Sequence, residues 1–365
     1  MLSANVGADI LTQATPKDAA TLKAVAQRTG LSITTVSRVL RGRHREARIS
    51  EATCARVEAA ALQAGYHPHR QAQGLRLGKS NLLGVCVVAK RGAPSNNASE
   101  MLKGICYTAT RHNLATVAIA ADNVEDDLRA VDRFLNARVD GIVYQQRWNT
   151  PEISQRLNHL HDRGVPVITV HDRDAGCRCP YVGGDYVLGG QMVTEHLLSL
   201  GHRRIAYLGL TPDPPSDLRR PLSRYQGYLL AMRRHDLPPL AFTTPGTFYP
   251  DAAQAAARLL AARPSATAVV CFNDKLALAT RHAAIAAGLS VPRDLAITGY
   301  DESEAALYAD LPLTSVEIPF YDIGRRAVER ILGIGCADPE ELLPPILHVR
   351  ASSGGALAPQ QGGRT

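Results

Sequence analysis

The stretch TLKAVAQRTGLSITTVSRVL, residues 21–40, decides the first part of the fold. Val25 and Ala26 follow Leu22 by three and four residues, the spacing of one face of a helix. Gly30 suits the end of that helix because glycine adopts the left-handed conformation without strain. Two short helices joined by a tight turn predict a helix-turn-helix, whose second helix enters the major groove of DNA.

The second helix is expected to begin after Ser32, a favourable N-cap residue, and to present polar side chains outward. An arginine can donate two hydrogen bonds to guanine, methyl groups suit thymine, and small hydroxyls suit phosphates. Taken alone, Arg38 could equally be a solvated surface charge. The side chains expected to contact DNA are Ile33, Thr34, Thr35, Ser37 and Arg38.

The distribution of charge supports a polyanionic partner. The net charge is +7 over 365 residues. Residues 1–80 hold 12 Lys and Arg against 5 Asp and Glu, whereas the remaining chain holds 29 of each kind. The whole excess therefore surrounds the helix-turn-helix, as expected of a protein that neutralises phosphates.

A third helix over 51–64, with Val57 and Leu62 facing the first two, completes a predicted DNA-binding domain at 20–66. Residues 1–19 are expected to be a flexible extension. Residues 67–80 form a predicted hinge, because Gly74 and few apolar residues make this segment marginal as a helix.

From residue 81 to 353, short apolar runs alternate with amphipathic helical stretches. This pattern predicts an α/β core with two parallel sheets, each covered by helices on both faces. Ligands of such folds bind beyond the carboxyl ends of the strands. The polar tail at 354–365 is expected to be disordered.

The remaining composition narrows the class of protein. Seven cysteines without a paired framework suggest reduced thiols, a cytoplasmic location and no metal site. A signal peptide and a membrane-spanning run are not expected. The familiar glycine-loop and nucleophile motifs of enzymes are missing, so no catalytic residue and no cofactor are predicted.

The chain resembles the lactose/galactose repressor family of bacterial transcription regulators. The resemblance runs from about residue 21 to 353 and is carried by motifs in the family's order. They are TLKAVAQRTGLSITTVSRVL, RVEAAALQAGYHP, GLRLGKSNLLGV, VGGDYVLGGQMVTEHLLSLGHRRIAYLG, AVVCFNDKLALATRHAAIAAGLSVPRDLAITGYDESEAA and LPLTSVEIP.

The resemblance implies a homodimer that binds a palindromic, double-stranded operator. It also implies a hinge helix that folds on DNA, in which Leu75 would open the central base step from the minor groove, with Ala72 and His69 also at the DNA. The physics is consistent, because an apolar wedge exchanges unstacking energy for a bent site with more contact.

The family's core resembles periplasmic sugar-binding proteins, with two Rossmann-like lobes, three crossovers and an effector between the lobes. We expect lobe 1 at about 81–201 and 317–343, and lobe 2 at about 202–316 and 344–353. Asp274 would cap the helix that follows it, and Asp185 could serve as a loop cap instead of a ligand. The residues that match effector-binding positions are Asn97, Trp148, Asp185, Arg224, Asn273, Asp301 and Phe320.

One departure from the family bears on the effector. Residues 95–98, Ser-Asn-Asn-Ala, replace aromatic residues that could stack on a planar ligand. Hydrogen-bonding side chains there favour a sugar or a sugar acid over a purine, since each buried hydroxyl needs a partner. Two other functions stay open: a regulator whose core dimerises without sensing a ligand, and a DNA-binding domain fused to a sugar kinase-like enzyme.

Overall fold

The computed structural model describes residues 21–40, 44, 47–66, 79–88, 96–121, 123–146, 150–171, 174, 176–210, 223–245, 250–262 and 265–354. The chain divides into two compact units, residues 1–78 and 79–365. The predicted extension at 1–19, most of the hinge and nearly all of the tail lie outside the described residues.

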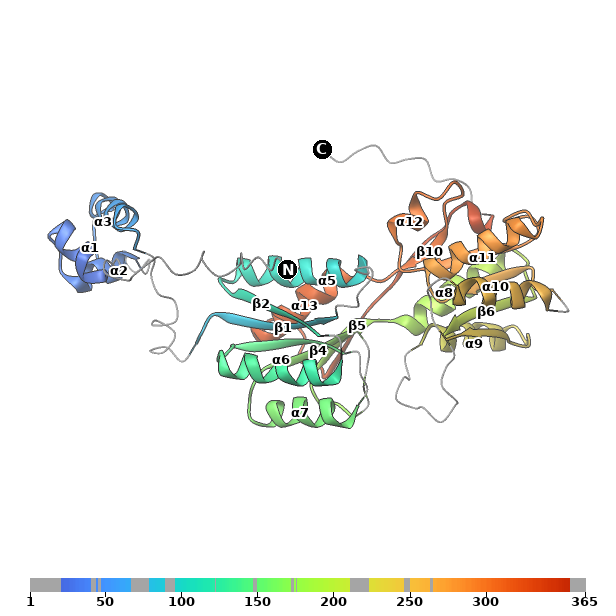
Figure 1. Cartoon of the computed structure of the whole chain (residues 1–365), viewed down its shortest axis with the longest axis horizontal. Helices are drawn as coiled ribbons and strands as arrows, with labels where there is room; N and C mark the ends of the chain where they lie inside the picture. The colour runs from blue at the N-terminus through green and yellow to red at the C-terminus, as the bar shows by residue number, and fades with distance from the viewer. Residues whose placement is uncertain are drawn as a thin grey trace, which may run out of the picture. The chain divides into compact units, whose positions relative to one another are not determined.

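The first unit contains three helices around a small aliphatic core (Figure 1). They are α1 (Leu22–Thr29), α2 (Ile33–Leu40) and α3 (Glu51–Gln63). The side chains of Val25, Val36 and Val57, one from each helix, are fully buried. The predicted helix-turn-helix and third helix are confirmed.

Local hydrogen bonds explain where these helices begin and end. The Ser32 hydroxyl accepts a hydrogen bond from the Thr35 amide at 3.1 Å, which confirms the predicted N-cap. Gly30 ends α1 with φ of +67°, the left-handed conformation expected of this turn.

The predicted inward face of α3 was wrong at Leu62, whose side chain is 80% exposed. Cys54, Val57 and Ala61 face the core instead. These three follow the i, i+3, i+7 spacing of one helical face, whereas residue 62 lies about 100° further around the helix.

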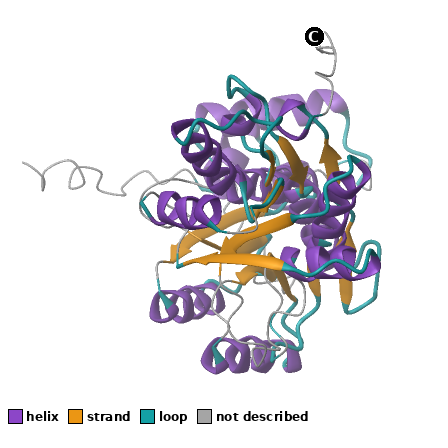
Figure 2. Cartoon of the chain, turned by 90° about the vertical axis from the view of Figure 1, so that its right-hand side faces the viewer, coloured by secondary structure: helices purple, strands orange, loops and turns teal. Residues whose placement is uncertain are grey.

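The second unit contains two six-stranded sheets, each flanked by helices (Figure 2). Sheet 1 has the order β11-β5-β4-β3-β1-β2 and sheet 2 the order β12-β10-β9-β8-β6-β7. Every strand pair is parallel except β10 with β12. The strands of sheet 1 are β1 (Leu82–Val88), β2 (Ala115–Ala121), β3 (Gly141–Gln146), β4 (Val167–His171), β5 (Tyr181–Gly184) and β11 (Glu340–Leu343); those of sheet 2 are β6 (Ile205–Leu210), β7 (Leu240–Thr244), β8 (Ala268–Cys271), β9 (Ala296–Tyr300), β10 (Thr314–Glu317) and β12 (Ile346–His348).

Helices cover the sheets in two sets, which we call lobe 1 and lobe 2 by the sheet that each contains. In lobe 1, α5 and α13 lie on one side of the sheet, and α6 and α7 on the other (Figure 1). The lobe 1 helices are α5 (Asn96–Arg111), α6 (Val124–Asn136), α7 (Pro151–Asp162) and α13 (Phe320–Ile331); those of lobe 2 are α8 (Tyr186–Ser199), α9 (Arg224–Arg234), α10 (Asp251–Ala261), α11 (Asp274–Ala286) and α12 (Glu304–Leu307), with the short 3-10 turn η1 (Ala351–Ser353).

The chain crosses between the lobes three times, as the resemblance implied. The first crossing was expected near residue 201 but lies at Asp185, because α8 packs against α9 and sheet 2. The second follows β10 at Glu317, and the third separates β11 from β12 at Pro344 and Pro345. The sequence does not mark the first crossing, since a single residue separates β5 from α8.

Each lobe contains one pair of helices that cross on glycine. In lobe 1, a Cβ added to Gly104 of α5 would lie 2.0 Å from the carbonyl oxygen of Tyr321 in α13. In lobe 2, a Cβ added to Gly190 of α8 would lie 2.1 Å from the carbonyl oxygen of Arg224 in α9. Because backbone atoms cannot move aside as a flexible side chain can, both crossings require glycine.

A carboxylate holds the point where the second unit begins. The amides of Ser80 and Asn81 donate hydrogen bonds to the two carboxylate oxygens of Asp140, both at 2.7 Å. Asp140 directly precedes β3, so the first residues after the linker are tied to the middle of sheet 1.

Candidate functional site

The second helix of the helix-turn-helix presents the predicted DNA-contacting residues at its surface. Ile33 is 49% exposed, and Thr34 and Arg38 are also exposed. Thr35 and Ser37 are half-buried, and the Thr35 hydroxyl lies 2.8 Å from that of Ser32. The predicted hinge contacts His69, Ala72 and Leu75 lie outside the described residues.

The predicted effector residues follow the carboxyl ends of the parallel strands in both lobes. Asn97 is the second residue of α5, which follows β1, whereas Asn273 follows β8 and Asp301 follows β9. Arg224 is the first residue of α9, and Phe320 the first of α13. Trp148 follows β3 but lies outside the described residues.

An ion pair between Arg224 and Asp301 forms the centre of this group. The guanidinium donates a hydrogen bond to the carboxylate at 3.0 Å, and the two side chains are only 12% and 20% exposed. The Arg224 Cζ atom lies 4.8, 4.4 and 4.2 Å from the ring centroids of Tyr186, Phe272 and Tyr300. The positive charge of Arg224, close to three aromatic rings, is stabilised by cation–π attraction as well as by its counter-ion.

Burial and charge shift the pKa of both partners. Burial raises the pKa of the Asp301 carboxyl above its ordinary value, opposed by the Arg224 guanidinium and by a hydrogen bond from Asn97. Burial disfavours the charge on Arg224, but Asp301 and the neighbouring tyrosines raise the pKa of the guanidinium above its usual range. Arg224 therefore stays charged.

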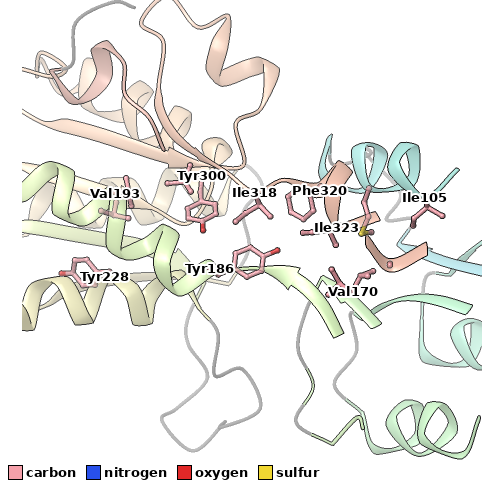
Figure 3. Packing of buried hydrophobic residues seen from close by; sticks show 14 of the residues in the cluster. Ile105, Val170, Tyr186, Val193, Tyr228, Tyr300, Ile318, Phe320 and Ile323 are labelled. Atoms are coloured by element: carbon pink, nitrogen blue, oxygen red, sulfur yellow. The ribbon is translucent and has the colours of Figure 1, made fainter. Parts of the chain in front are cut away.

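Asn97 and Asp301 join the two lobes, since α5 belongs to lobe 1 and β9 to lobe 2. Near the second crossing, the ring of Phe320 stacks on His171, with centroids 6.2 Å apart. Figure 3 shows Phe320 beside Ile318, with Tyr186 and Tyr300 on the other side of that crossing. These aromatic side chains belong to one buried cluster that includes residues of both lobes.

Two predicted effector residues serve as helix caps. Asn273 accepts a hydrogen bond from the Leu276 amide at 3.0 Å, and Asp185 accepts one from Leu188 at 2.8 Å. The prediction that Asp274 caps the helix that follows it was wrong, because Asn273 is the N-cap of α11. Asp274 turns instead toward Ser303 and Ser315. Adjacent Asn and Asp are equally good caps by type, so the sequence could not distinguish them.

Several residues of this group were not predicted from the sequence. His171 ends β4 with φ of +80°, and its carbonyl oxygen accepts a hydrogen bond from the Tyr181 hydroxyl at 2.7 Å. The sequence could have indicated His171, because it is a titratable residue at the carboxyl end of a predicted strand. Tyr186, Phe272 and Tyr300 gave no such signal, since each reads as an ordinary core aromatic.

Two family models match the chain. Residues 194–353 match the periplasmic binding protein-like domain. Residues 21–69 match the bacterial regulatory proteins of the lacI family. The second match covers the three-helix unit described above. The first unit therefore matches the lacI family of DNA-binding domains, and most of the core matches the periplasmic binding proteins. This combination is that of a DNA-binding transcription regulator with a ligand-binding type of core.

Curated relatives and solved structures agree with these matches. The chain is 29% identical to the ribose operon repressor of Escherichia coli K12, over 92% of this chain and all of the relative. It is 28% identical to catabolite control protein A of Priestia megaterium, over 84% and 90%. The lac repressor dimer bound to operator and the anti-inducer ONPF matches with a TM-score of 0.75 and 26% identity, over 93% and 99%.

The complex of the regulator CelR with cellobiose matches with a TM-score of 0.64 and 27% identity, over 91% of this chain and 99% of that one. These likenesses confirm the predicted fold of a helix-turn-helix unit and a two-lobed α/β core. Within the parts of the chain that the structure describes, no helix is long and apolar enough to cross a bilayer.

Proposed function

We propose that the protein is a cytoplasmic, nucleoid-associated repressor that binds a palindromic operator as a homodimer and responds to a sugar. It controls carbohydrate or sugar-acid utilisation and carries out no catalysis. On the DNA side, the proposal assigns base and phosphate contacts to the exposed face of α2 and minor-groove contacts to residues 69, 72 and 75. The exposure of Ile33, Thr34 and Arg38 supports this assignment.

The observation that carries the effector proposal is the buried Arg224–Asp301 pair among three aromatic rings. A polyhydroxyl ligand needs both donors and acceptors beside an apolar face. Arg224 supplies donors, Asp301 supplies acceptors, and the rings supply the face. The proposed effector residues are Asn97, Trp148, Asp185, Arg224, Asn273, Asp301 and Phe320.

The charge of the pair favours a neutral sugar over a sugar acid. Asp301 already neutralises the Arg224 guanidinium at 3.0 Å, so a carboxylate ligand would compete with it for the same cation. The relatives fit a carbohydrate effector: one is a ribose operon repressor, and one similar solved structure is a complex with cellobiose.

A homodimer is supported by an apolar edge in lobe 1. Strand β2 ends sheet 1, contains no charged residue and is mostly exposed, with Val117 at 37%. The neighbouring α5 adds Tyr107, which is 57% exposed. An uncharged, exposed edge strand is a ready partner for another chain.

Fluorescence anisotropy of the full chain on its own upstream DNA tests the proposal. Titrations at two salt concentrations, with D-ribose, cellobiose and other neutral sugars and with their acids, should show specific, salt-steep binding that a neutral sugar changes about 5–150-fold. Specific binding that no compound alters would favour the ligand-insensitive regulator. Binding without DNA preference would contradict the whole proposal.

A further inference from the structure

The turn that carries Asp301 has an unfavourable backbone. Asp301 has φ of +99° and Glu302 has φ of +48°, so two consecutive residues with side chains lie in the left-handed region. Such conformations persist only where the surrounding structure holds them. Since Asp301 is the partner of Arg224, whatever holds this turn also positions the centre of the proposed effector site.

A single carboxylate, that of Asp274 at the start of α11, forms the hydrogen bonds that hold the turn. Its Oδ2 accepts a hydrogen bond from the Ser303 amide at 2.7 Å. Its Oδ1 accepts one from the Ser315 hydroxyl at 2.7 Å, and the oxygen of that hydroxyl accepts one from the Glu302 amide at 3.1 Å. Both amides that follow Asp301 are thereby tied, directly or through one side chain, to the same group.

The fold makes room for this carboxylate inside lobe 2. Asp274 is 1% exposed, and a Cβ added to Gly299 would lie 2.0 Å from its Oδ1. Burial raises the pKa of Asp274 to about 6, opposed by the hydrogen bonds from Ser303 and Ser315. The ionisable groups that bear on it are Asp301, which raises its pKa, and Cys271 on β8.

A second contact holds the other side of the turn. Arg350, which follows β12, forms an ion pair with Glu302 and donates a hydrogen bond to its Oε2 at 2.9 Å. The same guanidinium donates to the Leu313 carbonyl oxygen at 2.8 Å. The turn is therefore held between α11 and the last segment of lobe 2.

We propose that Asp274 is a positioning residue for the effector: with Ser315 it holds the strained turn at 301–303, so that the Asp301 carboxylate faces Arg224. Asp274 does not itself contact the ligand. This inference rests on the proposed function for its consequence in effector binding, whereas its effect on the turn does not depend on the identity of the ligand.

Hydrogen–deuterium exchange of the full chain, without added compound, tests the effect on the turn. Asp274→Asn and Ser315→Ala should each speed exchange in peptides that contain Glu302 and Ser303 by about tenfold or more. Asp294→Asn is the matched control, because Asp294 also accepts a backbone hydrogen bond in lobe 2, from Ser290 at 2.7 Å, but lies at the surface. It should leave the turn unchanged.

Unchanged exchange of the turn in a folded Asp274→Asn or Ser315→Ala chain would overturn the proposal. Calorimetry with D-ribose as the probe gives the second measurement, with an affinity about tenfold lower expected for Asp274→Asn and none lost for Asp294→Asn. Equal affinity in all three chains would overturn the positioning role. Absence of ribose binding in the unaltered chain would exclude ribose as the effector, and the exchange result would then decide the role of Asp274 in the turn.

Discussion

The two lobes share one architecture but contribute different chemistry to the proposed effector site. Each lobe has a six-stranded sheet and one helix pair that crosses on glycine. Lobe 1 provides only neutral side chains, Asn97 and Phe320. Lobe 2 provides the buried ions, Arg224 and Asp301, and the three rings around Arg224. Two similar folds can therefore divide a site into a neutral half and an ionic half.

The largest effect should come from removing one of the buried ions. Arg224→Met leaves Asp301 buried without its counter-ion, so we expect the free energy of unfolding to fall by about 3–5 kcal/mol and effector binding to be lost. Urea denaturation and calorimetry measure both. The control is Arg129→Met in lobe 1, which breaks an exposed pair with Glu125 and should leave both quantities unchanged. Equal losses in the two variants would contradict the division between the lobes.

The buried carboxyl group of Asp274 should make the stability of the chain depend on pH. The pKa of Asp274 rises from 3.8 to about 6 in the folded chain, so between these values the folded state holds a proton that the unfolded state has released. Stability should therefore fall as pH rises through this window and stay level above it, by up to about 3 kcal/mol. Unfolding of the unaltered chain and of Asp274→Asn, compared from pH 4 to 7, isolates this group. A constant difference between the two chains would contradict it.

The glycine crossings allow a matched comparison of the lobes. Gly190→Ala and Gly104→Ala each place a Cβ about 2 Å from a backbone oxygen. Each should lower the free energy of unfolding by about 1–3 kcal/mol. Gly190→Ala presses on the carbonyl of Arg224 and should also weaken effector binding more than tenfold. Gly104→Ala presses on Tyr321 in lobe 1 and should weaken effector binding less. If calorimetry shows the larger loss of effector affinity for Gly104→Ala, the Arg224–Asp301 pair is not the centre of the site.

The smallest effect on folding is expected at the two edge strands. Val117→Lys on β2 of lobe 1 should weaken dimerisation in sedimentation velocity while leaving the fold intact, because it places a charge on an apolar edge. Ala241→Lys on β7, the edge of sheet 2, is the control and should not change the dimer. Dissociation by the second substitution alone would place the interface in lobe 2.

Local patterns predicted much of this fold. The cap at Ser32, the turn at Gly30 and the strand–helix alternation of the core depend on neighbouring residues and were confirmed. The first crossing at Asp185 was missed, because the choice of lobe depends on contacts of α8 with distant α9. The inward face of α3 was predicted wrongly at Leu62, where hydrophobicity was given more weight than helical spacing.

The effector site was predictable by residue type but not by geometry. The pairing of Arg224 with Asp301 requires two residues 77 positions apart to meet. The tyrosines beside this pair look like ordinary core residues in the sequence. The exchange of roles between Asn273 and Asp274 depends on where Ser303 and Ser315 lie in space. Such long-range contacts leave no local pattern to read.

The tie between Asp140 and the amides of Ser80 and Asn81 has a mechanical consequence. Because the chain leaves lobe 1 from a fixed point on its sheet, a rotation of that lobe carries the start of the linker with it, without slack. Any change in the orientation of sheet 1 therefore reaches the chain at residues 80 and 81. Asp140→Ala would remove both hydrogen bonds and release these two residues from the sheet, while the helix-turn-helix and the Arg224–Asp301 pair keep all their own contacts.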